Sequence, residues 1–272
     1  MHWGECDMKS TRTERLIRMA SRFLTLPSRQ ISLTEMSEQF EVSKTVISDD
    51  VTIIDKAFRE EDLGAMSVGR GRSGGASFRP GFSGNFRSSF LASIAGILSS
   101  TDRILPGMLI HYSDILFNPG YARPLGYALA SDFADREPDV VMTSEVKGIP
   151  LAIFTAHALG IPMAVCRFRN RPSDGPAVAV HYPSGSGEVR TMFMGTRFLS
   201  SGERVLVIDD FMRGGSTAAG MLLVAREFGA EVIGTGIFIA ASEPARKAVS
   251  EYRALLRLER GADGVPIVKV QL

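Results

Sequence analysis

The most informative segment of the chain is Arg204-Val-Leu-Val-Ile-Asp-Asp-Phe-Met-Arg-Gly-Gly-Ser-Thr217. Its apolar residues 205–208 predict a buried strand, two carboxylates follow, and a loop of glycines and hydroxyls opens a predicted helix. The free N–H groups and the dipole of a helix start attract anions, and glycines let the backbone approach a phosphate closely. The segment therefore predicts a phosphate site at the carboxyl end of a strand.

Three kinds of site place two carboxylates after a strand. A Walker B acid requires a G-x-x-x-x-G-K-[ST] loop, which the sequence lacks. A catalytic dyad requires two carboxyl groups that share a proton, but Asp209 and Asp210 are adjacent in a strand and point to opposite faces. A ribose-phosphate site uses every element, with the aspartates accepting hydrogen bonds from sugar hydroxyls or binding Mg²⁺. We therefore expect a ribose-phosphate ligand.

Apolar strands alternate with helices over residues 81–272, which predicts an α/β domain with a parallel sheet and helices on both faces. Strands are predicted at 140–143, 163–167, 177–182, 205–208 and 232–238. Helices are predicted at 125–136, 151–159 and 217–228.

Residues 11–80 predict three helices followed by a hairpin. The first helix ends at Pro27, and Ser32 and Ser43 are predicted to cap the second and third. A short helix, a tight turn and a second helix are typical of the helix-turn-helix. The apolar face of the first helix is predicted to contain Leu16, Ile17, Ala20, Phe23 and Leu24.

The glycine-rich segment 65–80 matches G-x-G-x-x-G at Gly69, Gly71 and Gly74. A dinucleotide fingerprint must open a helix, and the residues that follow forbid one. The segment is instead typical of a hairpin, the wing of a winged helix, with Arg70 and Arg72 at its tip.

Basic residues gather locally, although 31 Lys+Arg against 30 Asp+Glu give a net charge of only +1. Residues 9–29 hold six basic side chains and one acid, and such a local patch steers a protein toward phosphates. The alternative is a helical dimerisation module with a solvated face. The residues expected to contact DNA are Arg12, Arg15, Arg18, Arg22, Lys44, Thr45, Ser48, Arg70 and Arg72.

Composition excludes several classes of protein. The 44% hydrophobic and 22% charged residues argue against disorder, and no apolar run is long enough to span a bilayer. Cys6 and Cys166 cannot form a disulfide framework. We expect a cytoplasmic protein, with residues 1–8 as an extension.

Residues 205–217 resemble the phosphoribosyl pyrophosphate (PRPP) motif of type I phosphoribosyltransferases. Further stretches resemble, in order, the purine operon repressor family, over residues 9 to about 260. They are Arg103-Ile-Leu-Pro-Gly107, Asp114-Ile-Leu116, Asp139-Val-Val-Met-Thr143, Lys147-Gly-Ile-Pro-Leu151 and Thr191-Met192. The resemblance implies a winged-helix domain over residues 1–80 and a phosphoribosyltransferase-like effector domain over residues 81–272.

The resemblance also implies ligand contacts. Asp209 and Asp210 would hold the ribose hydroxyls, and Phe211, beside Met212, would stack on a base or ribose. The 5-phosphate would lie in the loop of Arg213, Gly214, Gly215, Ser216 and Thr217. The pyrophosphate would meet Thr143, Ser144, Glu145, Val146, Lys147 and Arg167, under a loop that contains Tyr182. Glu145 departs from the family, whose loop carries small residues there.

Two functions remain open. The resemblance implies a homodimeric repressor of purine biosynthesis genes that leaves operator DNA when PRPP binds, with nucleotides such as guanosine tetraphosphate competing. The alternative is an active purine phosphoribosyltransferase with an accessory N-terminal domain. That enzyme needs polar groups to read a purine and an acid–base partner, and the sequence shows no such cluster. The histidines are scattered, at His2, His111, His157 and His181. We expect the repressor, with no catalytic residue and no resident metal.

Overall fold

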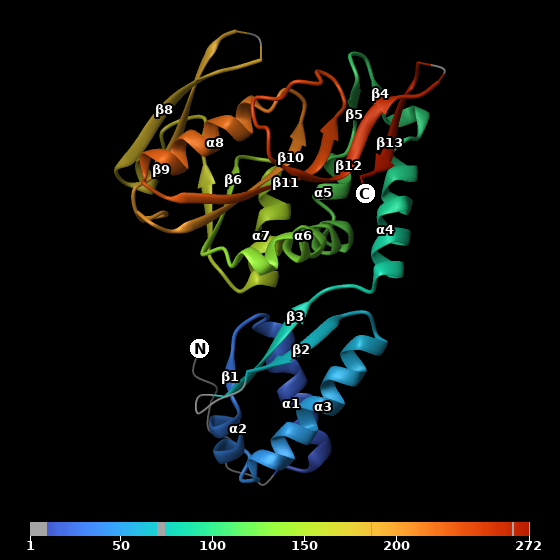
Figure 1. Ribbon diagram of the computed structural model, residues 1–272, viewed down its shortest axis with the longest axis vertical. Helices are drawn as coiled ribbons and strands as arrows, with labels where there is room; N and C mark the ends of the chain where they lie inside the picture. Colours follow the sequence, from blue (N-terminus) through green and yellow to red (C-terminus); the bar gives the residue numbers. More distant parts are fainter. Residues whose placement is uncertain (1–9, 70–73, 186, 263, 272) are drawn as a thin grey trace. The chain divides into compact units, whose positions relative to one another are not determined.

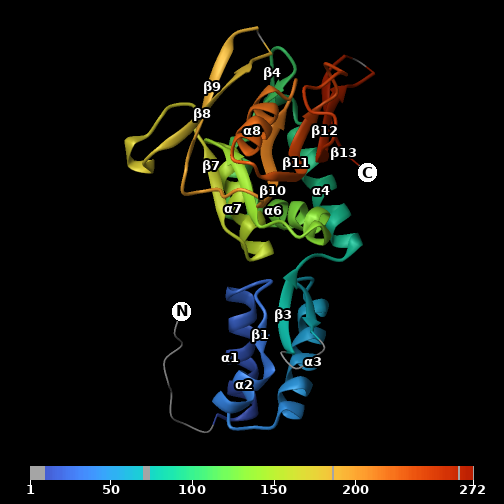
Figure 2. The same ribbon diagram turned by 60° about the vertical axis from the view of Figure 1, so that its left-hand side comes forward.

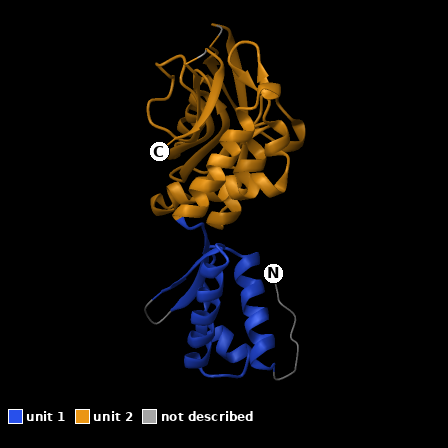
Figure 3. Ribbon diagram, turned by 90° about the vertical axis from the view of Figure 1, so that its right-hand side faces the viewer, with its two compact units in different colours: residues 1–83 blue, residues 84–272 orange. Residues whose placement is uncertain are grey.

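A computed structural model describes residues 10–69, 74–185, 187–262 and 264–271. The chain forms two compact units, residues 1–83 and 84–272 (Figure 3). The boundary predicted from sequence lay after residue 80. Within the described ranges, no helix has both the length and the apolar character needed to cross a membrane.

Unit 1 begins with three helices, α1 (Arg12–Thr25), α2 (Leu33–Gln39) and α3 (Lys44–Glu60). Each starts at a hydroxyl side chain, Thr11, Ser32 or Ser43, which accepts a backbone N–H at 3.3 Å. Such caps satisfy donors that have no partner inside the helix. The caps predicted at Ser32 and Ser43 are therefore confirmed.

A three-stranded antiparallel sheet completes unit 1, in the order β1 (Ile31–Ser32), β3 (Gly75–Pro80), β2 (Gly64–Val68). The glycine-rich segment is thus a hairpin, as predicted, and its last glycine, Gly75, opens strand β3. Gly69 donates its N–H to the carbonyl of Gly75 at 2.9 Å near the hairpin end. Arg70 and Arg72 lie outside the described residues.

The buried face of α1 differs from the predicted one. Met19 and Phe23 are fully buried in the unit 1 core, whereas Ile17 and Leu24 are 62% and 41% exposed. Two positions of the buried face carry arginines. Counting apolar residues alone therefore placed the predicted face at a different angle around the helix axis.

Unit 2 is built on a six-stranded sheet (Figures 1 and 2). Its parallel strands are β6 (Val140–Ser144), β7 (Met163–Cys166), β10 (Arg204–Met212), β11 (Glu231–Ala241) and β12 (Arg253–Arg260). An antiparallel edge strand, β13 (Pro266–Val270), pairs with β12. The order is β13-β12-β11-β10-β6-β7.

Helices cover both faces of this sheet. Leu206 and Ile208 of β10 belong to a core shared with α4 (Gly84–Leu98), α6 (Pro119–Phe133) and α7 (Gly148–Leu159). Val205 and Val207 pack on the other face with α8 (Ser216–Glu227). Alternate residues of a strand point to opposite faces, so β10 is buried on both sides. The parallel sheet with helices on both faces is as predicted.

The remaining elements are short. They are η1 (Thr101–Arg103), β4 (Ile104–Leu105), β5 (Leu109–Ile110), α5 (Ser113–Leu116), η2 (Ala134–Arg136) and η3 (Pro172–Asp174). The β4–β5 pair forms its own antiparallel hairpin.

The strand predicted at 177–182 does not join the main sheet. It is β8 (Ala177–Pro183), which pairs antiparallel with β9 (Val189–Gly195) in a separate hairpin. All of its residues but one are half-buried or exposed, as expected of a strand outside a covered sheet. The prediction also missed α4, β12 and β13, and it placed the start of α6 six residues too late.

Candidate functional site

Two predicted ligand loops meet at the carboxyl edge of the sheet. Strand β6 pairs with β10, with Met142 opposite Val207, so the residues after β6 lie beside Asp209. A Cβ atom added to Gly148, at the start of α7, would collide with Thr143 Oγ1 and lie 3.6 Å from Asp209 Oδ1. The structure therefore brings the 143–147 loop and the paired aspartates together, as the resemblance implied.

The two aspartates have different surroundings. Asp209 is 3% exposed, and burial, followed by the charge of Asp210, raises its pKa well above the ordinary 3.8. Thr143 beside it has a buried hydroxyl with no hydrogen-bond partner. Asp210 is half-buried on the opposite face, where Tyr112 donates its O–H to Asp210 Oδ2 at 2.6 Å. Asp210 is thus the accessible carboxylate of the pair.

Tyr112 joins several site residues and was not predicted. Its ring stacks on Phe211 with centroids 5.9 Å apart, and the Lys147 ammonium lies 4.6 Å from the ring centre. Burial, and then the charge of Asp210, raises the pKa of the Tyr112 hydroxyl. Sequence gave no signal for Tyr112, because it lies outside any motif and reaches the site only through the fold.

The predicted phosphate loop is hydrogen-bonded to residues 247–248. Gly215 caps α8 at φ +82°, a conformation that favours glycine, and no side chain caps the helix start. Gly214 accepts the Ala248 N–H at 2.8 Å, and Lys247 Nζ donates to the carbonyl oxygens of Arg213 and Ala241. The carbonyls of Arg213 and Gly214 point toward residues 247–248. The N–H groups at the start of α8 therefore remain available to an anion.

Three further residues of the implied ligand contacts are engaged by other parts of the protein. Arg167 is paired with Asp174 at 2.7 Å and with Glu145 at 3.4 Å, so carboxylates already engage its charge. Tyr182 is 2% exposed, and its ring packs on Gly220 of α8. The reason is that β8 packs as a strand on α8. Met212 is 1% exposed and packs on Ile237, as core packing would require.

Unit 1 presents the predicted recognition residues to solvent. Lys44, Thr45 and Ser48 are exposed on the first turns of α3. The Arg12 side chain is 60% exposed, and the Arg18 guanidinium lies 5.0 Å from the centre of the Phe40 ring.

Arg15 and Arg22 are buried, and the prediction that they contact DNA is wrong. Arg15 Nε donates to Asp50 Oδ2 at 2.6 Å, and Asp50 is fully buried. Arg22 donates to Gln39 Oε1 at 2.6 Å. These guanidinium groups therefore join α1 to α3 and α2. The more exposed Arg12 also donates its Nε–H to Asp50, at 3.2 Å.

Sequence comparison identifies both units. The model for "Bacterial purine repressor, N-terminal" matches residues 11–80, and that for "Phosphoribosyl transferase domain" matches residues 112–264. The chain is 38% identical over 252 residues to the purine biosynthesis transcriptional repressor PurR of Bacillus subtilis (strain 168), covering 92% of this chain and 88% of the relative. It belongs to the PurR family.

Other PurR relatives differ in the direction of their regulation. The purine biosynthesis transcriptional activator PurR of Lactococcus lactis subsp. lactis is 33% identical over 250 residues, covering 92% of each chain. The xanthine phosphoribosyltransferase of Lactobacillus delbrueckii subsp. bulgaricus is 32% identical over 142 residues, 50% of this chain and 75% of that enzyme.

Solved structures confirm the fold predicted for unit 2. Adenine phosphoribosyltransferase from Thermoanaerobacter pseudethanolicus matches with a TM-score of 0.53 and 17% identity, over 61% of this chain and 99% of that one. The enzyme from Rhodothermus marinus matches with a TM-score of 0.53 and 24% identity, over 62% and 99%. At these identities the likeness concerns the fold alone. Across the described part of this PurR family chain, no cluster of three His, Cys, Asp or Glu could hold a metal ion.

Proposed function

We propose that this PurR family protein represses purine biosynthesis genes in the cytoplasm, binds operator DNA through unit 1, and is released by PRPP bound in unit 2. The observation that carries the proposal is coverage: regulator relatives match 92% of the chain, whereas a transferase relative matches 50%. A transferase has no need of unit 1.

The exposed start of α3 supports the DNA half of the proposal. In a helix-turn-helix the first residues of the second helix reach base edges, and here these are Lys44, Thr45 and Ser48. Arg12 and Arg18 would contact phosphates. One short helix reads few base pairs, so two copies would bind a paired site as a homodimer.

The carboxyl edge of the unit 2 sheet supports the PRPP half. Asp210 would accept from the ribose hydroxyls, with Tyr112 setting its orientation. The 5-phosphate would lie at the uncapped start of α8, and the pyrophosphate, with or without Mg²⁺, would lie toward Lys147. Nucleotides such as guanosine tetraphosphate would compete, because they carry the same ribose and phosphate groups and would stack on Phe211. PRPP acts as an inducer only if it binds the DNA-free state more tightly.

A gel shift on DNA from the control region of a purine biosynthesis operon tests the proposal. We expect specific binding that PRPP with Mg²⁺ releases. Asp210→Asn should bind the DNA but resist PRPP, whereas Asp135→Asn, a change at an exposed site in η2, should behave as wild type. Lys44→Ala should lower the slope of log affinity against log salt by about one phosphate contact.

The other outcomes separate the alternatives. Specific binding that is indifferent to PRPP would keep the DNA half and overturn the PRPP half. Transcription in vitro from the same DNA distinguishes repression from activation, the role named for the Lactococcus relative. Absence of specific binding would overturn the proposal, and release of pyrophosphate from PRPP and a purine base would then establish the transferase.

A further inference from the structure

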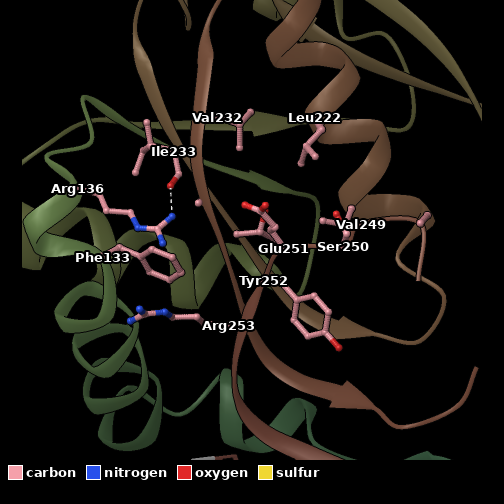
Figure 4. A pocket seen from close by; sticks show the side chains of 13 residues that line it. Phe133, Arg136, Leu222, Val232, Ile233, Val249, Ser250, Glu251, Tyr252 and Arg253 are labelled. Carbon is pink, nitrogen blue, oxygen red and sulfur yellow. Dashed lines mark hydrogen bonds between the residues drawn. The ribbon is translucent and has the colours of Figure 1, made fainter. Parts of the chain in front are cut away.

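A pocket of about 550 Å³ lies in unit 2 beside the first residues of β11 (Figure 4). It arises from a step in the sheet, because β12 begins at Arg253, which pairs with Gly236 in the middle of β11. Residues 231–235 of β11 therefore have β10 on one side and, among the described strands, no neighbour on the other. The volume is within the usual range for small-molecule sites.

The pocket has an apolar side and a cationic side. Leu222 of α8, Val232 of β11 and Val249 form the apolar side. On the cationic side, Arg136 and Arg253 flank the ring of Phe133, with their guanidinium carbons 5.6 and 5.8 Å from its centre.

Both arginines are anchored by uncharged groups. Arg136 Nη1 donates to the Ile233 carbonyl at 2.5 Å, and Arg253 Nη1 donates to the Asp132 carbonyl at 3.0 Å. Neither is ion-paired with a carboxylate anywhere in the described chain. A guanidinium held in place by carbonyls and a ring keeps its full charge for an incoming anion. Glu251, between the two sides, offers an acceptor to a donor group of the same ligand.

The free edge of β11 is poorly suited to an added peptide strand. The β10–β11 register shifts so that Val205 and Leu206 pair with Val232 and Gly234, which leaves Ile233 as a bulge. Arg136 also occupies the Ile233 carbonyl. Bulges and charged side chains are the features that protect sheet edges from strand addition. The occupant that fits is therefore a small molecule.

One wall of the pocket is attached to the phosphate loop. Ala248 lines the pocket and donates its N–H to Gly214 at 2.8 Å. A Cβ atom on Gly215 would lie 3.4 Å from Ala248 N and 3.5 Å from Val249 N. A molecule that displaces this wall must therefore also move the loop at the start of α8.

We propose that this pocket is a second effector site for a small anion with an aromatic or aliphatic body, coupled to the phosphate loop through residues 248–249. The inference that the coupling regulates the protein rests on the proposed PRPP site. The pocket and its attachment to the loop do not depend on that proposal. Two sites that share a wall influence each other reciprocally when a ligand displaces that wall.

Titration of the full chain with 8-anilinonaphthalene-1-sulfonate, an aromatic anion, tests the site by fluorescence. We expect Arg136→Ala and Arg253→Ala each to weaken binding about tenfold or more, because each removes a charge-assisted hydrogen bond. Leu222→Trp, which fills the apolar side, should abolish it. Arg123→Ala, at an exposed position of α6 outside the pocket, is the matched control and should bind as wild type. Equal affinity in all of these proteins would overturn the site.

Hydrogen exchange of the loop amides at 214–219 tests the coupling without PRPP. The probe should change their exchange in wild type but not in Leu222→Trp. A pocket that binds the probe while these amides keep their exchange rate would overturn the coupling. If the probe behaves as expected but PRPP does not bind, the proposed function fails while the second site stands.

Discussion

The buried ion pair between α1 and α3 makes the sharpest test of how unit 1 is held together. Asp50 is fully buried and accepts from Arg15 at 2.6 Å and from Arg12 at 3.2 Å. Asp50→Asn keeps the shape of the side chain and removes its charge. The 60% exposed Arg12 side chain can then turn to water, but that of Arg15, only 6% exposed, cannot.

The expected cost follows from the charge that is left behind. Removing one partner of a buried pair costs about 3–5 kcal/mol, because the other charge stays buried without compensation. We therefore expect Asp50→Asn to lower the free energy of unfolding of unit 1 by about 3 kcal/mol or more. About 1.4 kcal/mol corresponds to a tenfold change, so this is a factor of about 150 in the unfolding equilibrium.

Hydrogen exchange followed by mass spectrometry measures the effect in the intact chain. The slowest amides of α1 and α3 report the opening of unit 1, and peptides from β10 and β11 are an internal control from unit 2. We expect protection to fall about 150-fold or more in α1 and α3 and to stay unchanged in unit 2.

The matched control is Glu60→Gln, also in α3. It removes an exposed Lys56–Glu60 pair at 3.8 Å, a kind of pair worth less than about 0.5 kcal/mol. A fall of less than tenfold for Asp50→Asn, or equal falls for both variants, would show that the α1–α3 contact does not depend on this charge.

Three further predictions concern unit 2. Burial raises the folded-state pKa of Asp209 above its ordinary 3.8, so stability should fall as pH rises through that folded pKa; urea unfolding between pH 4 and 8 should show this slope in wild type and lose it in Asp209→Asn. Tyr112→Phe removes the hydroxyl that donates to the half-buried carboxylate of Asp210 and should cost about 1–3 kcal/mol in urea unfolding at pH 7; no loss would mean that water replaces the hydroxyl. Gly126→Ala places a methyl 2.6 Å from a side-chain carbon of α7 and should lower the melting temperature. Gly96→Ala places a methyl in open space on the exposed face of α4 and should raise it. Two shifts of the same sign would contradict the close α6–α7 contact.

Elements set by local sequence were predicted well. The β10 strand, its aspartates and the glycine loop before α8 are contiguous, so a single segment specifies strand, site and helix start. The caps at Ser32 and Ser43 are equally local, because a hydroxyl bonds to an N–H three residues away. The hairpin at 64–80 follows from glycines between two short strands.

Elements that depend on partners far along the chain were missed or misplaced. Strands β12 and β13 and the separation of β8 from the main sheet depend on which strand lies alongside, and no local pattern specifies that. Arg15 and Arg22 belong to a charged stripe by sequence, yet Asp50 and Gln39 turn them inward.

The sequence alone determined the two-part organisation, the glycine loop that opens α8 and the exposed first turns of α3, because each depends on consecutive or periodic residues. Only the tertiary structure decided that Tyr112 contacts Asp210, that Asp209 is buried, and that a pocket shares a wall with the glycine loop before α8. These features join residues that are distant in the chain; Tyr112 and Asp210, for example, are separated by 98 positions. The burial, hydrogen bonding and charge compensation of a side chain depend on the residues around it. They are therefore set only when the fold brings distant residues together.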